Sequence, residues 1–120
     1  MTDINDFYQG DTKSYRFQFG AGVDITGWKM FFTLKTNETD DDVDAVMQVS
    51  AVAGDNVLDD IANGLMYVVA SSTDTSSVGI IPNTKYHYDF QRVISGTPPD
   101  VKTLIAGKVK VMQGITNTVV

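Results

Sequence analysis

The stretch IIPNTKYHYDFQRV, from Ile80 to Val93, decides how the rest of the chain is interpreted. Within it Tyr86, Tyr88 and Phe90 alternate with polar residues. Alternation with a period of two puts successive side chains on opposite faces of a β-strand. The pattern therefore predicts a strand whose three rings enter a core while the intervening polar side chains face away from it.

The approach to this strand is typical of a tyrosine corner. Ile80, Pro82, Thr84 and Tyr86 occupy every second position. In immunoglobulin-like sandwiches, a Tyr near the start of the sixth strand turns its hydroxyl back to the backbone a few residues upstream. We expect Tyr86 to do the same, which favours a β-sandwich and says nothing about activity.

Other segments repeat the strand pattern between turns rich in Gly, Asp and Ser. The predicted strands are Phe7–Tyr8, Lys13–Phe19, Trp28–Lys35, Ala45–Ala51, Gly64–Ala70 and Val101–Val111. No long amphipathic helix competes with them. We therefore predict an all-β fold, an immunoglobulin-like antiparallel β-sandwich of about seven strands, in a single domain over residues 1–120. Trp28, Tyr86, Tyr88 and Phe90 are its predicted structural residues, Trp28 because such domains bury a Trp on the third strand.

Two local irregularities are also expected. Leu104, Ala106 and Gly107 mark a β-bulge in the last strand. A helical turn fits between Ser72 and Val78, with Ser71 or Ser72 as its N-cap.

Composition narrows the possible partners. The chain has 120 residues, no cysteine and a net charge of −6. Disulfides and thiolate metal sites are excluded. The acidic balance argues against a protein that binds nucleic-acid phosphates, and no apolar run approaches the ~20 residues that span a bilayer. We expect no nucleic-acid or membrane partner, and a polar N-terminus unlike a signal peptide indicates a protein made in the cytoplasm and used by assembly.

An acidic loop is the sharpest candidate for a metal site. Asp40, Asp42 and Asp44 have the i, i+2, i+4 spacing of calcium loops. An EF-hand then needs Gly and Glu where this chain has Ala45 and Ala51, so that interpretation fails. A solvated loop is the simpler interpretation, and a looser calcium site is the alternative. We expect no other cofactor.

His87, the single histidine, does not indicate catalysis. Catalytic zinc usually needs three protein ligands. His87 and Asp89 lie two apart on one strand, where they sit side by side and cannot form a relay with a serine. We expect the chain not to be an enzyme.

An apolar ring on the polar face of a strand points to an interface. Phe31 stands opposite the core-facing side of Trp28–Lys35 and is expected at a sheet edge or contact surface. The strand after the acidic loop, with Ala45, Met47 and Val49, is the second candidate. Edge strands offer unpaired backbone groups that a neighbouring subunit can complete. The aromatic residues also leave a carbohydrate-binding module open as an alternative, with Tyr8 and Phe31 as the candidate exposed rings.

Several pieces in order resemble a domain of phage and prophage particles. They are YQGD leading into KSYRFQF, DITGW leading into MFFTLK, the acidic loop before AVMQVS, and YHYDFQ leading to TLIAGKVKV. Together the chain is similar to the immunoglobulin-like N-terminal domain of baseplate upper proteins and to small tail proteins of that build.

The resemblance implies a structural role without catalytic residues. The expected partners are other virion proteins, in rings or trimers, so a homo-oligomer is possible. The expected location is the virion, in the tail or baseplate, with a head or capsid decoration protein as a variant. The chain differs from that family in its length, because baseplate proteins of that type continue into a fibre or receptor-binding region.

Overall fold

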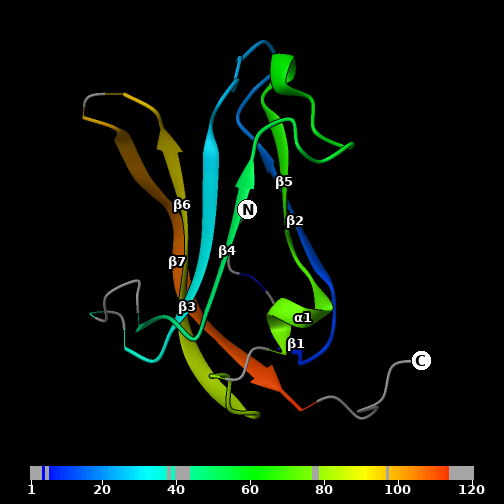
Figure 1. The fold of residues 1–120 in the computed structure, drawn as a ribbon, viewed down its shortest axis with the longest axis vertical. Helices are drawn as coiled ribbons and strands as arrows, with labels where there is room; N and C mark the ends of the chain where they lie inside the picture. Colours follow the sequence, from blue (N-terminus) through cyan, green and yellow to red (C-terminus); the bar gives the residue numbers. More distant parts are fainter. Residues whose placement is uncertain are drawn as a thin grey trace.

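The computed structural model describes residues 4, 6–37, 39, 44–76, 79–96 and 98–113. Strands dominate these residues and form two sheets (Figure 1). The strands are β1 (Phe7–Tyr8), β2 (Lys13–Gln18), β3 (Lys29–Lys35), β4 (Met47–Val52), β5 (Leu65–Ala70), β6 (Thr84–Ile94) and β7 (Asp100–Met112). Two single turns, the 3-10 helix η2 (Ile61–Asn63) and the α-helix α1 (Ser72–Thr75), accompany them. The all-β class is confirmed.

The larger sheet has the strand order β1-β7-β6-β3-β4, and β2 pairs with β5 in the smaller one. Most pairs are antiparallel, but β1 runs parallel to β7, with Phe7 opposite Val111. The prediction of an entirely antiparallel arrangement is wrong at this strand. Nearly the whole chain separates β1 from β7, so no hairpin fixes their relative direction.

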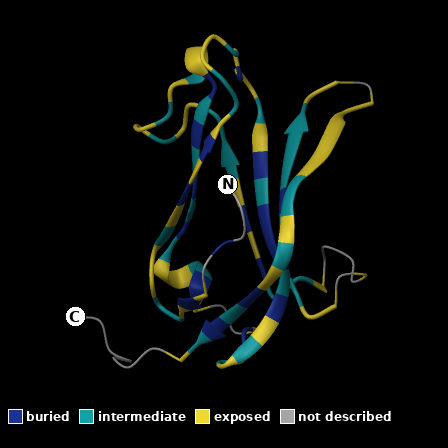
Figure 2. Cartoon of the chain, turned by 180° about the vertical axis from the view of Figure 1, so that it is seen from behind, coloured by how far each residue is buried: buried dark blue, intermediate teal, exposed yellow. Residues whose placement is uncertain are grey.

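The core lies between the two sheets (Figure 2). On β3 the predicted face of Met30, Phe32 and Leu34 is fully buried. Tyr86 and Phe90 of β6 are 2% and 0% exposed, as the period-two pattern predicted. Burying a large apolar side chain stabilises a fold by about 1.5–3 kcal/mol, so these rows are the main source of stability.

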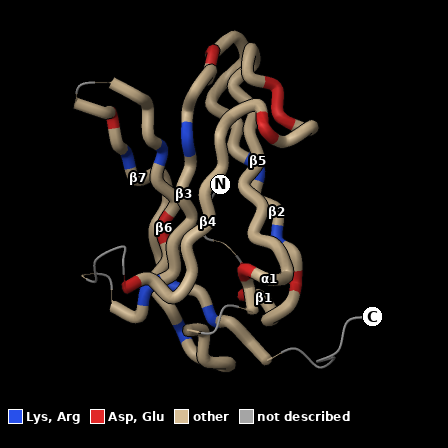
Figure 3. The backbone as a smooth tube through the Cα atoms, viewed as in Figure 1, with Lys and Arg blue, Asp and Glu red and all other residues tan. Residues whose placement is uncertain are grey.

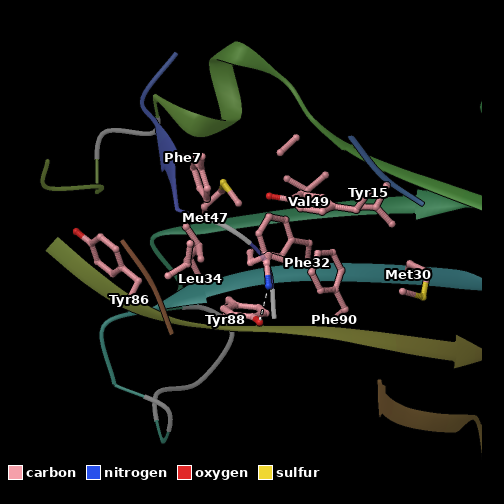
Figure 4. Packing of buried hydrophobic residues seen from close by; sticks show 14 of the residues in the cluster. Phe7, Tyr15, Met30, Phe32, Leu34, Met47, Val49, Tyr86, Tyr88 and Phe90 are labelled. Carbon is pink, nitrogen blue, oxygen red and sulfur yellow. Dashed lines mark hydrogen bonds between the residues drawn. The ribbon is translucent and has the colours of Figure 1, made fainter. Parts of the chain in front are cut away.

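Phe90 is the centre of the aromatic packing (Figure 4). Its ring stacks on Phe32 of β3, with centroids 4.3 Å apart and planes 6° from parallel. From the opposite sheet, Tyr15 and Phe17 approach the same ring at 5.2 and 5.0 Å. Such pairs add about 0.5–1.5 kcal/mol each beyond area burial. Tyr15 also meets Phe32 edge-on at 5.3 Å, so the cluster joins the two sheets through both Phe90 and Phe32.

The tyrosine-corner geometry is confirmed locally. The backbone N–H of Ile81 donates to the hydroxyl of Tyr86 at 2.6 Å. Two residues further along β6, the hydroxyl of Tyr88 accepts the N–H of Ile4 at 3.2 Å, a bond drawn dashed in Figure 4. Both structural tyrosines thus bury their rings and hold the backbone of another segment with their polar ends.

Trp28 differs from its prediction in position. It precedes β3, is half-buried and packs against the end of the core, outside its centre. Its ring meets Phe19 edge-on at 5.1 Å, and the Arg92 guanidinium lies over it at 5.3 Å. A cation over an indole face stabilises by about 0.5–1 kcal/mol at an exposed site. Gly27, with φ of 78°, turns the chain immediately before Trp28 and so leaves the ring at the rim.

A bulge in β7 and a helical turn at α1 are present as predicted, but α1 ends at Thr75, and Val78 lies outside the described residues. Phe90 pairs with Ile105 and Gln91 with Thr103, so Leu104 is the extra residue of a bulge in β7. Ala106 and Gly107 keep the regular register. At α1, Ser71 is the N-cap and forms a capping box with Asp74.

Candidate functional site

β4 forms one outer edge of the larger sheet, since it pairs only with β3. Beyond the strand end, the N–H of Ala53 donates to the carbonyl of Trp28 at 2.9 Å. Hydrogen-bonded and non-hydrogen-bonded pairs alternate along an antiparallel ladder. The register of β3 with β4 therefore turns the backbone N–H and C=O groups of Gln48 and Ser50 away from β3, toward the free edge.

On two other strands, β5 and β7, an aspartate carboxylate accepts an outward-facing backbone N–H. On β5, the N–H of Tyr67 donates to Asp59 Oδ1 at 2.8 Å, and Leu65 exchanges backbone bonds with Asp60. On β7, the N–H of Lys110 donates to Asp6 Oδ1 at 2.9 Å. A buried or charged cover of this kind is how proteins keep edge strands from pairing with other chains.

β4 has none of these devices among the described residues. Its sequence, MQVSAV, contains no charged residue and no proline, and its register with β3 is regular. The side chains of Gln48 and Ser50 are exposed. Beside the strand runs a groove of about 320 Å³ lined by residues of β4, β5 and the loop between them, which are Ser50, Ala51, Val52, Asp55, Asn56, Tyr67 and Val69. A further strand added to β4 would lie along this groove.

The predicted interface residues fall on two strands, with mixed outcomes. The segment Ala45–Ala51 does contain an edge strand, although β4 begins at Met47 and leaves half-buried Ala45 outside it. Met47 and Val49 are 3% and 8% exposed and belong to the core, so their side chains cannot face a partner. The prediction chose the wrong face of this strand, because the side chains that point outward are those of Gln48 and Ser50.

Phe31 is not at an edge. It lies on β3, between Ser50 of β4 and Gln91 of β6, and is only half-buried. The expectation of an edge position is wrong because β3 has partners on both sides. Its ring still lies on the outer face, one strand in from the free edge, where cross-strand neighbours cover part of it.

The predicted metal site is not assembled from described residues. Asp40 and Asp42 lie outside the described residues, whereas Asp44 is described and exposed. Another acidic loop, which contains Asp59, follows the far end of β4, so a strand of about 20 Å separates Asp44 from Asp59. Within the described part of the chain, no group of three His, Asp or Glu side chains is placed to hold a metal ion.

Asp59 instead serves the backbone. Its carboxylate accepts the N–H groups of Gly54, Asn56 and Tyr67 at 2.9, 3.3 and 2.8 Å. A carboxylate with three backbone donors ties the loop to β5 and has few lone pairs left for a cation.

His87 lines a shallow hollow on the outer face of the larger sheet. The hollow measures about 640 Å³, and its floor is made of small side chains such as Thr33 and Ala106. Charged groups at its rim include Lys35, Asp89 and Lys108. No Ser or Cys is among its described lining residues, so these residues do not supply the usual Ser–His or Cys–His nucleophile pair.

Exposed aromatic rings are sparse on the described surface. Tyr8 is 43% exposed, whereas Phe31 is half-buried. Tyr8 is on β1 and Phe31 on β3, with β7 and β6 between them. The two rings named for a carbohydrate-binding platform therefore do not lie side by side.

Among the described residues, two ionisable groups have shifted pKa values. Burial raises the pKa of the Tyr15 phenol to about 12, and nearby Tyr88 adds to the shift. The Tyr15 hydroxyl has no hydrogen-bond partner among the described residues. A hydrogen bond from the Thr26 hydroxyl, joined by one from the Thr26 N–H, lowers the pKa of the exposed Asp24 carboxyl. Both effects are structural: neither group lines the groove or the hollow.

Sequence reasoning missed the contrast between edges. Neither Asp59 nor Asp6 belongs to a sequence motif that would mark it as a cap on a strand edge. Their capping roles depend on which residues the loops bring beside a strand, which no short-range pattern encodes. The sequence does show that MQVSAV has no charged residue, but this fact becomes informative only once β4 is known to be an edge strand.

Among the described residues, no helix is both long and apolar enough to cross a membrane. The chain was also compared with known proteins. No protein-family model matches it, and no curated protein is significantly similar to it in sequence.

Proposed function

We propose that this chain is a non-enzymatic structural protein of a phage or prophage particle, placed in the tail or baseplate, that acts through protein–protein contacts. The observation that carries the proposal is the free edge of β4. Among the described residues nothing covers its outward backbone groups at Gln48 and Ser50, whereas an aspartate carboxylate accepts the Tyr67 N–H on β5 and another accepts the Lys110 N–H on β7. A neighbouring virion protein would complete this edge with a strand of its own.

The fold is consistent with the resemblance that suggests this role. The larger sheet faces the smaller one across a common core, and Tyr86 closes a tyrosine corner at the start of β6. We infer an immunoglobulin-like sandwich from these two features. In such a scaffold the sheet edges are the surfaces at which subunits can join without altering the core.

The edge can be blocked without disturbing the ladder. The Ser50 N–H points away from β3, so Ser50→Pro removes a donor from the free edge and no bond between β3 and β4. Ser14→Pro is a matched control. Ser14 is likewise an exposed serine on a strand, and the bond from Phe19 N–H to the Gly64 carbonyl fixes a register in which its N–H points away from β5.

The experiment compares both variants in the host that encodes the chain. Particles are purified after release and their proteins are quantified by mass spectrometry. We expect the native chain and Ser14→Pro at the same fixed ratio to other particle proteins, and Ser50→Pro to be depleted although it folds in purified form. A native chain that is absent from particles would contradict the virion role, and equal incorporation of all three would contradict the role of the β4 edge.

A further inference from the structure

Lysines face one another across the strand pair β6–β7. Lys85 pairs directly with Lys110, and two residues further along His87 pairs with Lys108. Their neighbours Tyr86 and Val109 are buried, so these four side chains project from the outer face of the sheet. Lys35 of β3 stands opposite His87 and extends the group. We call these five residues the basic ladder.

The ladder has a cost that the fold alone does not offset. Like charges directly opposite one another destabilise a strand pair. The described residues give Lys85, Lys108 and Lys110 no ion pair, although Asp6 and Asp89 adjoin the ladder.

The positive charges of the chain are concentrated on the larger sheet, although the chain as a whole has a net charge of −6. Of its nine Lys and Arg residues, two lie on β3, two on β6 and three on β7, so seven are on this sheet. In Figure 3, several of these basic residues, in blue, gather low in the view, at the end where β6 begins.

The opposite end of the molecule carries the complementary charge. The loop after β4 contains Asp55, Asp59 and Asp60, red at the top of Figure 3. Between them Val57 and Leu58 are 95% and 61% exposed. We call residues 55–60 the acidic tip.

Hydrogen bonds hold the acidic tip in one shape. Asp59 accepts from the N–H groups of Gly54 and Asn56. Asn56 Oδ1 accepts the Leu58 N–H at 2.9 Å, and the Asn56 carbonyl accepts the Asp59 N–H. A loop ordered in advance presents its two apolar side chains without a further entropy cost on binding.

Apolar groups are exposed at the ladder end as well. Ile81 is 65% exposed, just before the turn into β6, and Tyr8 is 43% exposed on β1. Tyr8 pairs with Met112, two residues beyond Lys110 on β7. Both ends therefore combine apolar side chains with charge, and the two charges are opposite.

We propose that the acidic tip of one copy docks on the basic ladder of a second copy, so that the chain associates head to tail. This deepens the proposed function by naming one partner, and it uses a surface other than the β4 edge. A head-to-tail contact joins two different patches, so it leaves each copy with a free tip or ladder and builds a ring or a filament. The tip of a second copy would offer carboxylates to the lysines of the basic ladder, next to the exposed side chains of Val57 and Leu58.

The acidic tip is a single loop of six residues, so we expect the contact to be small and its strength modest. Interfaces below about 1,200 Å² are typical of transient contacts. Surface ion pairs are screened by salt, with a Debye length of about 10 Å at 0.1 M. Association should thus grow with protein concentration and weaken as salt is raised, and a closed ring would strengthen it through repeated contacts.

A charge exchange tests the contact. In variant A, Lys85→Glu and Lys108→Glu reverse the ladder; in variant B, Asp55→Lys and Asp60→Lys reverse the tip. All four residues are exposed, so the fold should persist. Each variant alone opposes like charges at the contact, whereas a mixture pairs opposite charges again at both kinds of contact. A control with Lys29→Glu and Lys102→Glu changes the net charge as variant A does, outside the ladder.

Sedimentation velocity of the purified chain measures the result, at about 50 mM and about 500 mM salt. We expect the native chain and the control to associate at low salt, A and B each to weaken association about tenfold or more, and the A–B mixture to restore it. A native chain that stays monomeric at millimolar concentration in low salt would overturn the proposal, as would a mixture that associates no better than A or B alone.

The outcome separates this contact from the virion role. If the mixture fails to associate while the native chain is present in particles, only the head-to-tail contact is wrong. If the mixture associates while the chain is absent from particles, only the virion role is wrong.

Discussion

Replacing Tyr86 with phenylalanine removes one hydroxyl and leaves the ring that fills the core. That hydroxyl accepts the backbone N–H of Ile81 at 2.6 Å, across a separation of five residues. Tyr86 is 2% exposed, so its ring packing should be retained in Tyr86→Phe. The variant therefore isolates the bond that holds the chain entering β6 against the strand itself.

The expected loss follows from one net hydrogen bond and one donor left without a partner. A hydrogen bond contributes about 0.5–1.5 kcal/mol, and an unsatisfied donor costs more when it is shielded from water. Ile81 is 65% exposed, so water can reach part of its backbone and limit that second cost. We expect the free energy of unfolding to fall by about 1–2 kcal/mol, out of the roughly 5–15 kcal/mol typical of a domain.

Urea unfolding followed by far-ultraviolet circular dichroism measures this loss. The midpoint should fall by about 0.5–1 M while the slope with denaturant stays unchanged. Tyr67→Phe is the control. Tyr67 is half-buried, and its hydroxyl makes no hydrogen bond within the described residues, so its stability should stay within about 0.5 kcal/mol of native. A loss below about 0.3 kcal/mol in Tyr86→Phe would refute the structural role of the corner, because it would place the bond below the range for one satisfied hydrogen bond.

Three further substitutions test the core, the acidic tip and a turn. Tyr15→Phe removes a buried hydroxyl that has no partner among the described residues, so stability at neutral pH should stay equal or rise. Because burial raises the pKa of the folded Tyr15 phenol to about 12, the phenol ionises first in the unfolded chain, and the stability of the native protein should fall from pH 10 upward. In melting curves recorded at alkaline pH, the variant should lack the part of this fall that comes from Tyr15. Asp59→Ala should destabilise the protein by about 1–3 kcal/mol in urea and speed hydrogen exchange at the Tyr67 amide, whereas an unchanged amide would mean that the carboxylate does not cap β5. Gly64→Ala should lower the melting temperature, because Gly64 has φ of 71° and a Cβ would lie 2.6 Å from the Gly20 carbonyl oxygen; an equal melting temperature would show that this approach can relax freely.

Local periodicity accounts for most of what the sequence predicted correctly. The rings of Tyr86, Tyr88 and Phe90 enter the core because alternation on a strand leaves only two faces to choose between. Ser71 caps α1 because its side chain and that of Asp74 are in reach within one turn. Each of these features depends on residues fewer than five positions apart.

Features that depend on the sheet order were predicted poorly. Phe31 was expected at an edge, but β3 has β4 and β6 on either side. Met47 and Val49 were expected to face a partner, and they face the core because the register with β3 aligns them with Leu34 and Phe32. Strand order and register join segments far apart in the chain, and alternation alone does not say which face of a new strand is buried.

The candidate surfaces show the same limit. The basic ladder arises from residues on β3, β6 and β7 that no sequence window contains together. The acidic tip has three Asp residues within six positions of the sequence, but the exposure of Val57 and Leu58 depends on how Asp59 folds that loop onto β5. In both cases the sequence shows which residues are charged, but it does not show which residues lie beside them in the folded chain.

Hydrogen exchange at the backbone amides of Gln48 and Ser50 tests the central claim most directly, with the free chain compared with the chain in purified particles. In the free chain these two amides face away from β3 and should exchange quickly, while Val49 between them, bonded to β3, should be protected. In particles, both amides should become protected and the amide of Ser14 on β2 should stay fast. Equally fast exchange of Gln48 and Ser50 in the free chain and in particles would contradict the claim that a neighbouring protein completes the β4 edge.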